Sequence, residues 1–265
     1  MQTPLAAGSL APQIPRQMER ALASGVLQPT ATHEQALVEG GVAFSVRQIV
    51  DFDRKRRSNV EQAQSGADPF QPPYSDDLFV GDLSDTHVVL LNKFPVLRDH
   101  LLIVTRAFEP QQSRLTDADF AALWACMREL GGLGFYNGGP AAGASQPHKH
   151  LQWIPLEGEL PTAALLASEA RGFGCASTPV EEGVALAAQY RRLCEELKLE
   201  DSEPYNLLVT RQSMYVIPRG RHAWEGISVN AMGFAGSFLV PNAGALQKLR
   251  ELGPRRVLSG VSRLV

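Results

Sequence analysis

The sequence has few cysteines, no long apolar stretch and no excess of basic residues. Its three cysteines, at positions 126, 175 and 194, form no CxxC pair, which excludes a disulfide framework and a thiolate zinc knuckle. No apolar run approaches the ~18 residues of a membrane span, and the first eight residues lack the basic and apolar regions of a secretory signal. Lys and Arg number 25 and Asp and Glu number 28, so the formal charge is −3, which disfavours a net-basic nucleic-acid-binding surface. We therefore expect a cytoplasmic protein that binds neither nucleic acid nor membrane.

The remaining composition is that of a globular protein. With 265 residues, of which 44% are hydrophobic, the chain is long enough to bury a large core. Runs rich in β-branched and apolar residues predict strands at residues 42–50, 86–92, 100–105, 205–210 and 213–218. Helical spacing of apolar residues predicts helices at residues 13–24, 116–130, 184–199 and 242–252. Thr116 and Asp119 form a capping-box variant at the start of the second helix. Because hairpins and helices are interspersed without βαβ alternation, we expect an α+β fold with a largely antiparallel sheet.

The most informative segment is a short extended run between Pro147 and Pro155. Side chains alternate between the two faces of a strand, so His148, His150 and Gln152 share one face. The residues between them, Lys149, Leu151 and Trp153, take the other face. A strand with a purely structural role would carry Val, Ile or Leu in place of two imidazoles and an amide. This pattern therefore indicates a functional site.

A segment rich in small residues lies just upstream of this run. It contains six glycines between positions 131 and 143 and is followed by Ser145 and Gln146. Small residues let backbone N–H groups approach an anion, and hydroxyl and amide side chains add donors. The sequence contains no GxxxxGK[ST] and no GxGxxG motif, and a glycine-rich loop alone is weak evidence. Next to the His-x-His-x-Gln run, we interpret it as a flexible loop that cradles phosphate.

Three interpretations of His148 and His150 stay open from the residues alone. The pair suits zinc or iron, but a metal site needs a third ligand, and Gln152 is a poor one. The two rings can also simply be polar residues packed against the glycine loop. In the third interpretation a neutral imidazole attacks phosphorus and carries a nucleotidyl group through a P–N bond.

The decapeptide Gly-Ala-Ser-Gln-Pro-His-Lys-His-Leu-Gln, residues 143–152, resembles the signature of the histidine-triad superfamily. Within that superfamily it is similar to the ATP adenylyltransferase branch, the diadenosine tetraphosphate (Ap4A) phosphorylases. Weaker similarity extends from about residue 45 to 240, in the segments 92–105, 205–219 and 226–236. The resemblance implies a histidine-triad-like fold over a single domain, residues 1–265, with an N-terminal extension at 1–40 and a tail at 255–265.

The resemblance also implies a mechanism and a set of site residues. His150 takes the position of the nucleophile, and Gln152 stands where the nucleotidyltransferases carry Gln and the hydrolases carry His. His148 would position the loop and His150, the latter through a backbone carbonyl. The expected reaction is phosphorolysis of Ap4A to ADP and ATP through an adenylyl-histidine, for which the covalent step needs no cofactor or metal; Mg²⁺ is compatible with the polyphosphate. Residues expected to line the ribose and phosphates are Asn137, Gly143, Ala144, Ser145 and Gln146.

For each further candidate phosphate-binding residue, a purely structural role is an open alternative. Residues 54–57 form the densest basic cluster, which is either a solvated loop or a cation source for the polyphosphate, and the resemblance singles out Lys55. Lys93, at a strand end, either contacts phosphate or caps a turn. Ser228 and Asn230 share a face if residues 227–230 are extended; they either reach the distal phosphates or belong to an ordinary turn.

Other aspects stay undetermined by the sequence. Arg219 and Arg221 either help to anchor a distal phosphate or are two surface arginines, and we favour the surface interpretation. Residues 157–183 and 255–265 carry no recognisable motif. Phosphate or another acceptor, Ap4A or a shorter dinucleotide, and the oligomeric state all stay open. A dinucleoside polyphosphate hydrolase is an alternative function, which Gln152 disfavours because an amide cannot activate water. A non-catalytic nucleotide-binding or sensor protein is another.

Overall fold

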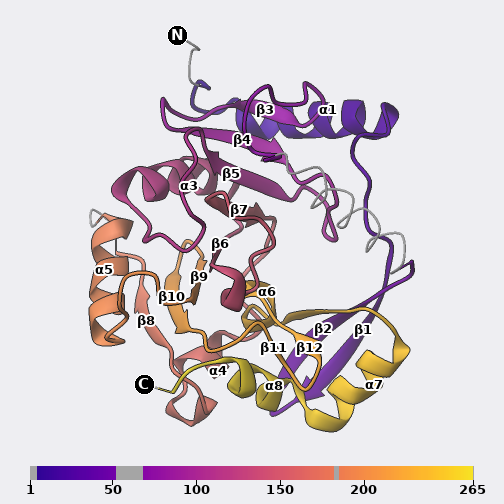
Figure 1. Ribbon diagram of the computed structural model, residues 1–265, viewed down its shortest axis with the longest axis vertical. Coiled ribbons are helices and arrows are strands. Elements are labelled where there is room, and N and C mark those ends of the chain that lie inside the picture. The colour runs from indigo at the N-terminus through magenta and orange to yellow at the C-terminus, as the bar shows by residue number, and fades with distance from the viewer. Residues whose placement is uncertain (1–4, 52–67, 182–184, 265) are drawn as a thin grey trace.

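The computed structural model describes residues 5–51, 68–181 and 185–264 (Figure 1). Within these ranges, eight strands form a large sheet in which every neighbouring pair is antiparallel. In spatial order the strands are β3 (Phe79–Asp82), β4 (His87–Leu91), β5 (Leu101–Thr105), β7 (His150–Ile154), β6 (Leu133–Gly138), β9 (Tyr205–Val209), β10 (Ser213–Pro218) and β8 (Ala176–Pro179). The predicted α+β class with a largely antiparallel sheet is confirmed.

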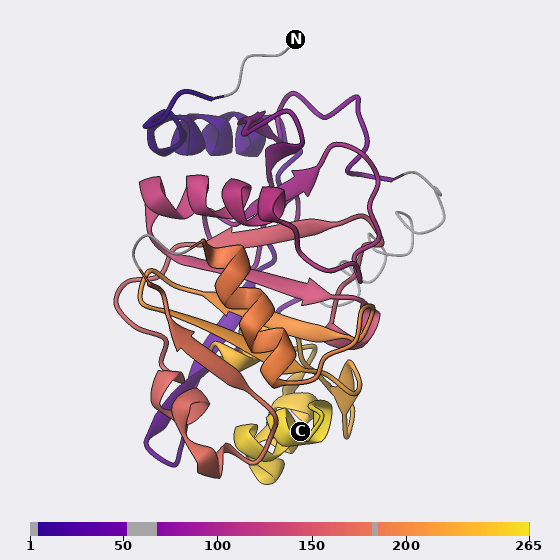
Figure 2. The ribbon, with the colours of Figure 1, turned by 90° about the vertical axis from the view of Figure 1, so that its left-hand side faces the viewer.

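Three helices cover one face of this sheet: α1 (Leu10–Ala23), α3 (Asp117–Leu130) and α5 (Leu186–Glu196). Figure 2 shows α3 and α5 lying in front of the strands. The predicted capping box is present, because the Thr116 side chain accepts from Asp119 N–H while the Asp119 side chain accepts from Thr116 N–H. The helix ends at Gly131, whose φ of 68° is a conformation that glycine adopts without strain. Leu123 and Met127 of α3 pack against Leu151 and Trp153 of β7 in this first core.

A second, smaller sheet covers the opposite face. It contains β1 (Thr32–Glu39), β2 (Val42–Ile49) and β13 (Ser237–Val240), with β13 parallel to β2. Three helices complete this layer: α6 (Ala231–Phe234), α7 (Ala243–Leu252) and α8 (Pro254–Val261). The shorter elements are η1 (Pro140–Ala142), α4 (Ala163–Ala167), η2 (Glu169–Arg171), β11 (Ala223–Trp224) and β12 (Ile227–Ser228). Phe44 and Phe238 meet edge to face, with ring centroids 6.0 Å apart, and join the second core to Phe135 of the large sheet.

Two sequence-based expectations need correction. Residues 131–139 are not a flexible loop throughout, because Gly134 and Gly138 lie within β6, a strand that the pattern does not predict. A Cβ on Gly134 would stand 2.7 Å from Leu123 Cδ1, so this glycine permits the close packing of α3 on β6. The sequence pattern also indicates no element after residue 254, whereas the structure has α8 there, with Val257, Leu258 and Val261 buried.

The other predicted elements are present with shifted ends. The strands expected at 42–50, 86–92, 100–105, 205–210 and 213–218 are β2, β4, β5, β9 and β10. The helices expected at 13–24, 116–130, 184–199 and 242–252 are α1, α3, α5 and α7. Among the residues that the structure describes, every helix is too short or too polar to traverse a bilayer. All three cysteines are unpaired and buried.

Candidate active site

The His-x-His-x-Gln run occupies the middle of the large sheet. β7 lies between β5 and β6, with His150 opposite Val104 and Gln152 opposite Leu102 on one side and Phe135 on the other. The predicted alternation is confirmed: Leu151 and Trp153 pack in the core beneath α3, whereas His150 and Gln152 line a cavity on the opposite face. Flanking strands on both sides fix the backbone from which these two side chains project.

His150 is held in one tautomer. Its Nδ1 lies 2.8 Å from the His148 carbonyl oxygen, which only accepts, so Nδ1 carries the proton and Nε2 has a free lone pair. Burial lowers the pKa of His150 to about 4, which keeps the ring neutral at physiological pH. Its backbone N–H donates to Gln111 Oε1 at 2.8 Å. The residue is therefore presented to the cavity as a neutral imidazole with an unprotonated Nε2.

His148 is fully buried and is not one of the residues that line the cavity. Its Nε2 lies 2.7 Å from the Thr105 carbonyl oxygen, and its Nδ1 lies 2.7 Å from Asp68 Oδ2. Both nitrogens are thus engaged within the protein, so His148 and His150 do not offer two free nitrogens to a metal. Asp68 Oδ1 also accepts from Phe70 N–H, and the Phe70 ring centroid lies 4.9 Å from that of His150. Asp68 therefore contacts both His148 and the backbone of Phe70, the residue that packs against the His150 ring.

Gln152 is oriented by a chain of hydrogen bonds that runs in one direction. The chain begins at Phe94 N–H, which donates to Asn92 Oδ1 at 3.1 Å and so turns Asn92 Nδ2 toward His100 Nδ1, also at 3.1 Å. His100 must then carry its proton on Nε2, which donates to Gln152 Oε1 at 3.0 Å. Burial lowers the pKa of His100 to about 4, so the ring stays neutral. With Oε1 occupied, the NH₂ group of Gln152 remains available to a ligand.

The sequence pattern does not single out His100 as a site residue. The only signal in the sequence is a polar side chain directly before the apolar run Leu101–Thr105. Its function depends on the register of β5 against β7, in which Leu102 lies opposite Gln152. That register is a property of the folded sheet.

Beside β7 lies a cavity of about 1060 Å³. It is bounded by the large sheet, by the loop after β6 and by the small sheet. The sequence-predicted site residues that line it are Lys93, Asn137, Gly143, Ala144, Ser145, Gln146, His150, Gln152, Ser228 and Asn230. Lys55 lies outside the described residues. The fold therefore brings together side chains that are separated by more than a hundred positions in the chain.

The loop after β6 is shaped by glycine at one close contact. Gly143 has a φ of 92°, and a Cβ there would stand 2.7 Å from Asn230 Cβ and 2.9 Å from the Val229 carbonyl oxygen. No larger residue fits this contact without moving the backbone. Asn137 Oδ1 accepts from Ala231 N–H at 2.8 Å, and Asn230 Oδ1 accepts from Met232 N–H at 3.0 Å. Both asparagines thus fix the start of α6 with their oxygens, which leaves their NH₂ groups and the neighbouring backbone for ligand contact.

Two arginines are placed where the sequence does not predict them. Arg47, on β2, lines the far wall of the cavity; its Nη2 pairs with Glu34 at 2.8 Å, and its buried Nε has no hydrogen-bond partner among the described residues. A buried, unpaired N–H is costly in free energy. Arg219 is not a surface residue, because only 2% of it is exposed.

Comparisons with known proteins identify the family to which the chain belongs. A family model described as the Ap4A phosphorylase N-terminal domain matches residues 1–168, and one described as the ATP adenylyltransferase C-terminal domain matches residues 160–263. The chain is 30% identical over 247 residues to diadenosine 5',5'''-P1,P4-tetraphosphate phosphorylase 2 of Saccharomyces cerevisiae, which covers 74% of this chain and 76% of that protein. It is 25% identical over 236 residues to Protein APA1 of the same yeast, covering 72% of this chain and 74% of that one.

Solved structures share the fold over nearly the whole chain. The crystal structure of yeast Ap4A phosphorylase Apa2 superposes with a TM-score of 0.79 at 24% identity, covering 99% of this chain and 98% of that one. The same yeast enzyme in complex with Ap4A gives a TM-score of 0.77 at 23% identity with the same coverage.

Proposed function

This chain belongs to the Ap4A phosphorylase family, and on that premise we propose that it cleaves Ap4A with inorganic phosphate to give ADP and ATP. It is a nucleotidyltransferase whose ligands are nucleotides. The observation that carries the proposal is His150, a neutral imidazole that lines the cavity of about 1060 Å³ and whose Nε2 has no hydrogen-bond partner among the described residues. We propose the cytoplasm as its location, since three unpaired cysteines suit a reducing compartment.

The first step forms a covalent adenylyl-enzyme. His150 Nε2 donates its lone pair to the α-phosphorus of one adenosine, and a P–N bond forms as the bond to the bridging oxygen breaks. That oxygen leaves with the electron pair as part of ATP. The positive charge that develops on the ring is stabilised by the His148 carbonyl oxygen, which accepts from Nδ1–H. His148 acts here as a positioning residue.

The second step transfers the nucleotide to phosphate. An oxygen of inorganic phosphate attacks the same phosphorus, the P–N bond breaks, and ADP leaves while His150 regains its lone pair. The Gln152 NH₂ group donates to a non-bridging oxygen in both steps, which its hydrogen bond from His100 makes possible. Because an amide neither gives up nor takes a proton, Gln152 cannot activate water, and this favours the anionic acceptor.

The remaining cavity residues are proposed to bind the substrate. Gly143, Ala144, Ser145 and Gln146 would contact the phosphates and ribose on one side of His150. Lys93 and Arg47 are proposed cations for the polyphosphate, and Asn137, Ser228 and Asn230 are proposed polar contacts. Lys55, which lies outside the described residues, is proposed as a further cation on the family resemblance alone. The covalent step as written uses only groups of this chain and the substrate. Mg²⁺ bound to the polyphosphate is compatible with it and would neutralise phosphate charge.

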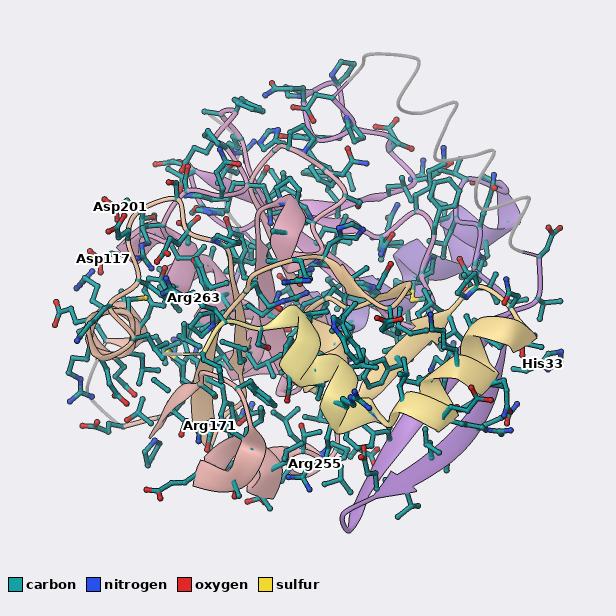
Figure 3. The ribbon with its side chains drawn as sticks, turned by 60° about the horizontal axis from the view of Figure 1, so that its bottom comes forward. His33, Asp117, Arg171, Asp201, Arg255 and Arg263 are labelled. Atoms are coloured by element: carbon teal, nitrogen blue, oxygen red, sulfur yellow. The ribbon has the colours of Figure 1, made fainter. Side chains whose placement is uncertain are left out.

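Incubation of the protein with Ap4A, with and without inorganic phosphate, tests this function. We expect ADP and ATP only when phosphate is present, and His150→Asn should abolish both. His33→Asn is the matched control, since His33 is exposed on β1 and lies at the edge of the molecule in Figure 3. AMP and ATP formed without phosphate would instead indicate a hydrolase. Tight nucleotide binding without turnover would indicate a binding protein.

A further inference from the structure

Arg219 follows β10 and is buried with all of its hydrogen-bond donors in use. Its guanidinium has five N–H groups, and each donates to an oxygen of the protein. The acceptors are Asn206 Oδ1 and the carbonyl oxygens of Ala142, Arg221, Val229 and Val261. All five are neutral oxygens. In the described part of the chain, no carboxylate pairs with this buried cation.

Several other arginines of the described chain do have a carboxylate partner. Arg191 pairs with Asp117, Arg114 with Asp201 and Arg263 with Glu203, in each case at or near the surface. Asp117, Asp201 and Arg263 are labelled in Figure 3, which shows the two aspartates at the edge of the molecule.

A buried charge without a counterion is costly, because neutral carbonyls replace only part of its hydration. Burial lowers the pKa of Arg219 to about 9, so the group is still protonated at neutral pH. The Phe234 ring, 5.4 Å from the guanidinium carbon, adds a weak attraction and no charge. The electrostatic balance of this region is therefore incomplete without an anion.

Arg219 connects the two loops that meet at the cavity. It holds Ala142, which directly precedes the cavity residue Gly143, and Val229, which directly precedes the cavity residue Asn230. The loops touch at Gly143, where a Cβ would collide with Asn230. In a trans peptide the N–H points opposite to the C=O. The Asn230 N–H therefore points away from the guanidinium, and no described atom accepts a hydrogen bond from it.

We propose that Arg219 is a positioning residue that holds these two loops together through its hydrogen bonds to the Ala142 and Val229 carbonyl oxygens. Its positive charge, which no carboxylate among the described residues pairs, makes the cavity favour ligands with more phosphate groups. The guanidinium itself does not touch the ligand. Its field acts across the protein interior, where charges are screened less than in water. This proposal rests on the proposed function, because it assumes that the cavity holds a nucleotide polyphosphate.

The test compares two arginines that the sequence places two residues apart. Arg219→Met and the exposed control Arg221→Met each remove one positive charge, and both are made in a His150→Asn background, which prevents turnover. Dissociation constants for adenosine, AMP and ATP are measured by titration calorimetry. For Arg219→Met we expect the dissociation constant for adenosine to change by less than about twofold and that for ATP to rise by at least about tenfold. The rise for AMP should lie between these two. Arg221→Met should leave all three dissociation constants within about twofold of those of the His150→Asn protein.

Equal weakening of all three ligands in Arg219→Met would show that Arg219 supports only the shape of the loops, and would overturn the proposal. Identical results for Arg219→Met and Arg221→Met would overturn it as well. If Arg219→Met does not fold, Arg219→Lys decides, because it keeps the charge with fewer hydrogen bonds. In Arg219→Lys, the ratio of the affinities for adenosine and ATP should stay close to that of the His150→Asn protein. Loss of the preference for ATP would contradict the proposal.

Failure of the proposed function is recognised separately. It appears as a wild-type protein that does not convert Ap4A and phosphate to ADP and ATP, whatever the Arg219 variants bind.

Discussion

At the scale of single residues, the candidate site is defined by which atom of each side chain is already engaged. His150 Nδ1 and Gln152 Oε1 are occupied by the protein, so Nε2 of the first and the NH₂ group of the second remain for the ligand. The sequence predicts the alternation of these residues, because a period of two is a local property of a strand. It does not predict His100, Asp68 or Arg47, because their contacts form between segments distant in the chain. It places Arg219 wrongly, since an arginine after a strand is usually solvated.

The hydrogen-bond chain predicts that His100 acts through Gln152. Gln152→Ala should lower kcat by about 10²–10³-fold, because it removes a donor to the reacting phosphate. His100→Ala should lower kcat by a smaller factor, because Gln152 is then free to turn. In the Gln152→Ala background, His100→Ala should have less than about a twofold effect, which a double-mutant cycle on kcat measures. His33→Ala serves as the exposed control. Additive effects of the two substitutions would exclude this coupling.

At the scale of elements, two glycine positions decide how the backbone approaches the site. Gly134 lets α3 pack against β6, and Gly143 lets the loop after β6 contact the residues before α6. The glycine-rich sequence predicts that this region approaches a ligand. It does not predict β6, because the run Leu133–Gly138 contains two glycines that weaken a strand pattern. The end of α3 is predicted well, because the signal that ends a helix is a glycine next to its last residues in the chain, here Gly131.

Gly143→Ala tests the loop contact. We expect the added methyl group to push the loop away from Asn230 and Val229, and so to raise KM for Ap4A and lower kcat. Gly158→Ala is the matched control: its φ of 74° is also positive, but a Cβ there would meet nothing within 4 Å. Both variants carry the strain of a positive φ, about 1–2 kcal/mol. Steady-state kinetics that respond equally to the two substitutions would exclude a specific role for the contact.

At the scale of the whole molecule, the site exists because two sheets and several loops enclose one cavity. β2 and β13 bring Arg47 and Leu239 to one wall, and β7 brings His150 to the other. The sequence indicates a histidine-triad-like arrangement through its resemblance, and the antiparallel large sheet agrees. It contains no signal for how the small sheet packs against the large one, since that packing depends on tertiary contacts such as those of Phe44 and Phe238.

Enclosure of the site also predicts how stability depends on pH. Burial lowers the pKa values of His100 and His150 from 6.5 to about 4. As the pH falls below about 6.5, the unfolded chain takes up protons on these rings while the folded protein does not, so the unfolded state is favoured. The free energy of unfolding should therefore fall between about pH 6.5 and pH 4. Urea denaturation across this range measures it.

The histidine variants identify the groups responsible. His150→Asn should reduce by one the number of protons taken up on unfolding, and so lower the slope of the free energy of unfolding against pH. His33→Asn, at an exposed site, should leave this slope unchanged. A slope that is the same in wild type and His150→Asn would show that the His150 ring is not buried in its neutral form.

The central claim is that His150 Nε2 carries the nucleotide between the two halves of the reaction. The most direct measurement is mass spectrometry of the protein after incubation with Ap4A in the absence of phosphate, with peptide mapping of any adduct. We predict the added mass of one adenylyl group on the peptide that contains His150, its loss on addition of phosphate with release of ADP, and no adduct in His150→Asn. An active protein without such an adduct, or an adduct on another residue, would contradict the claim.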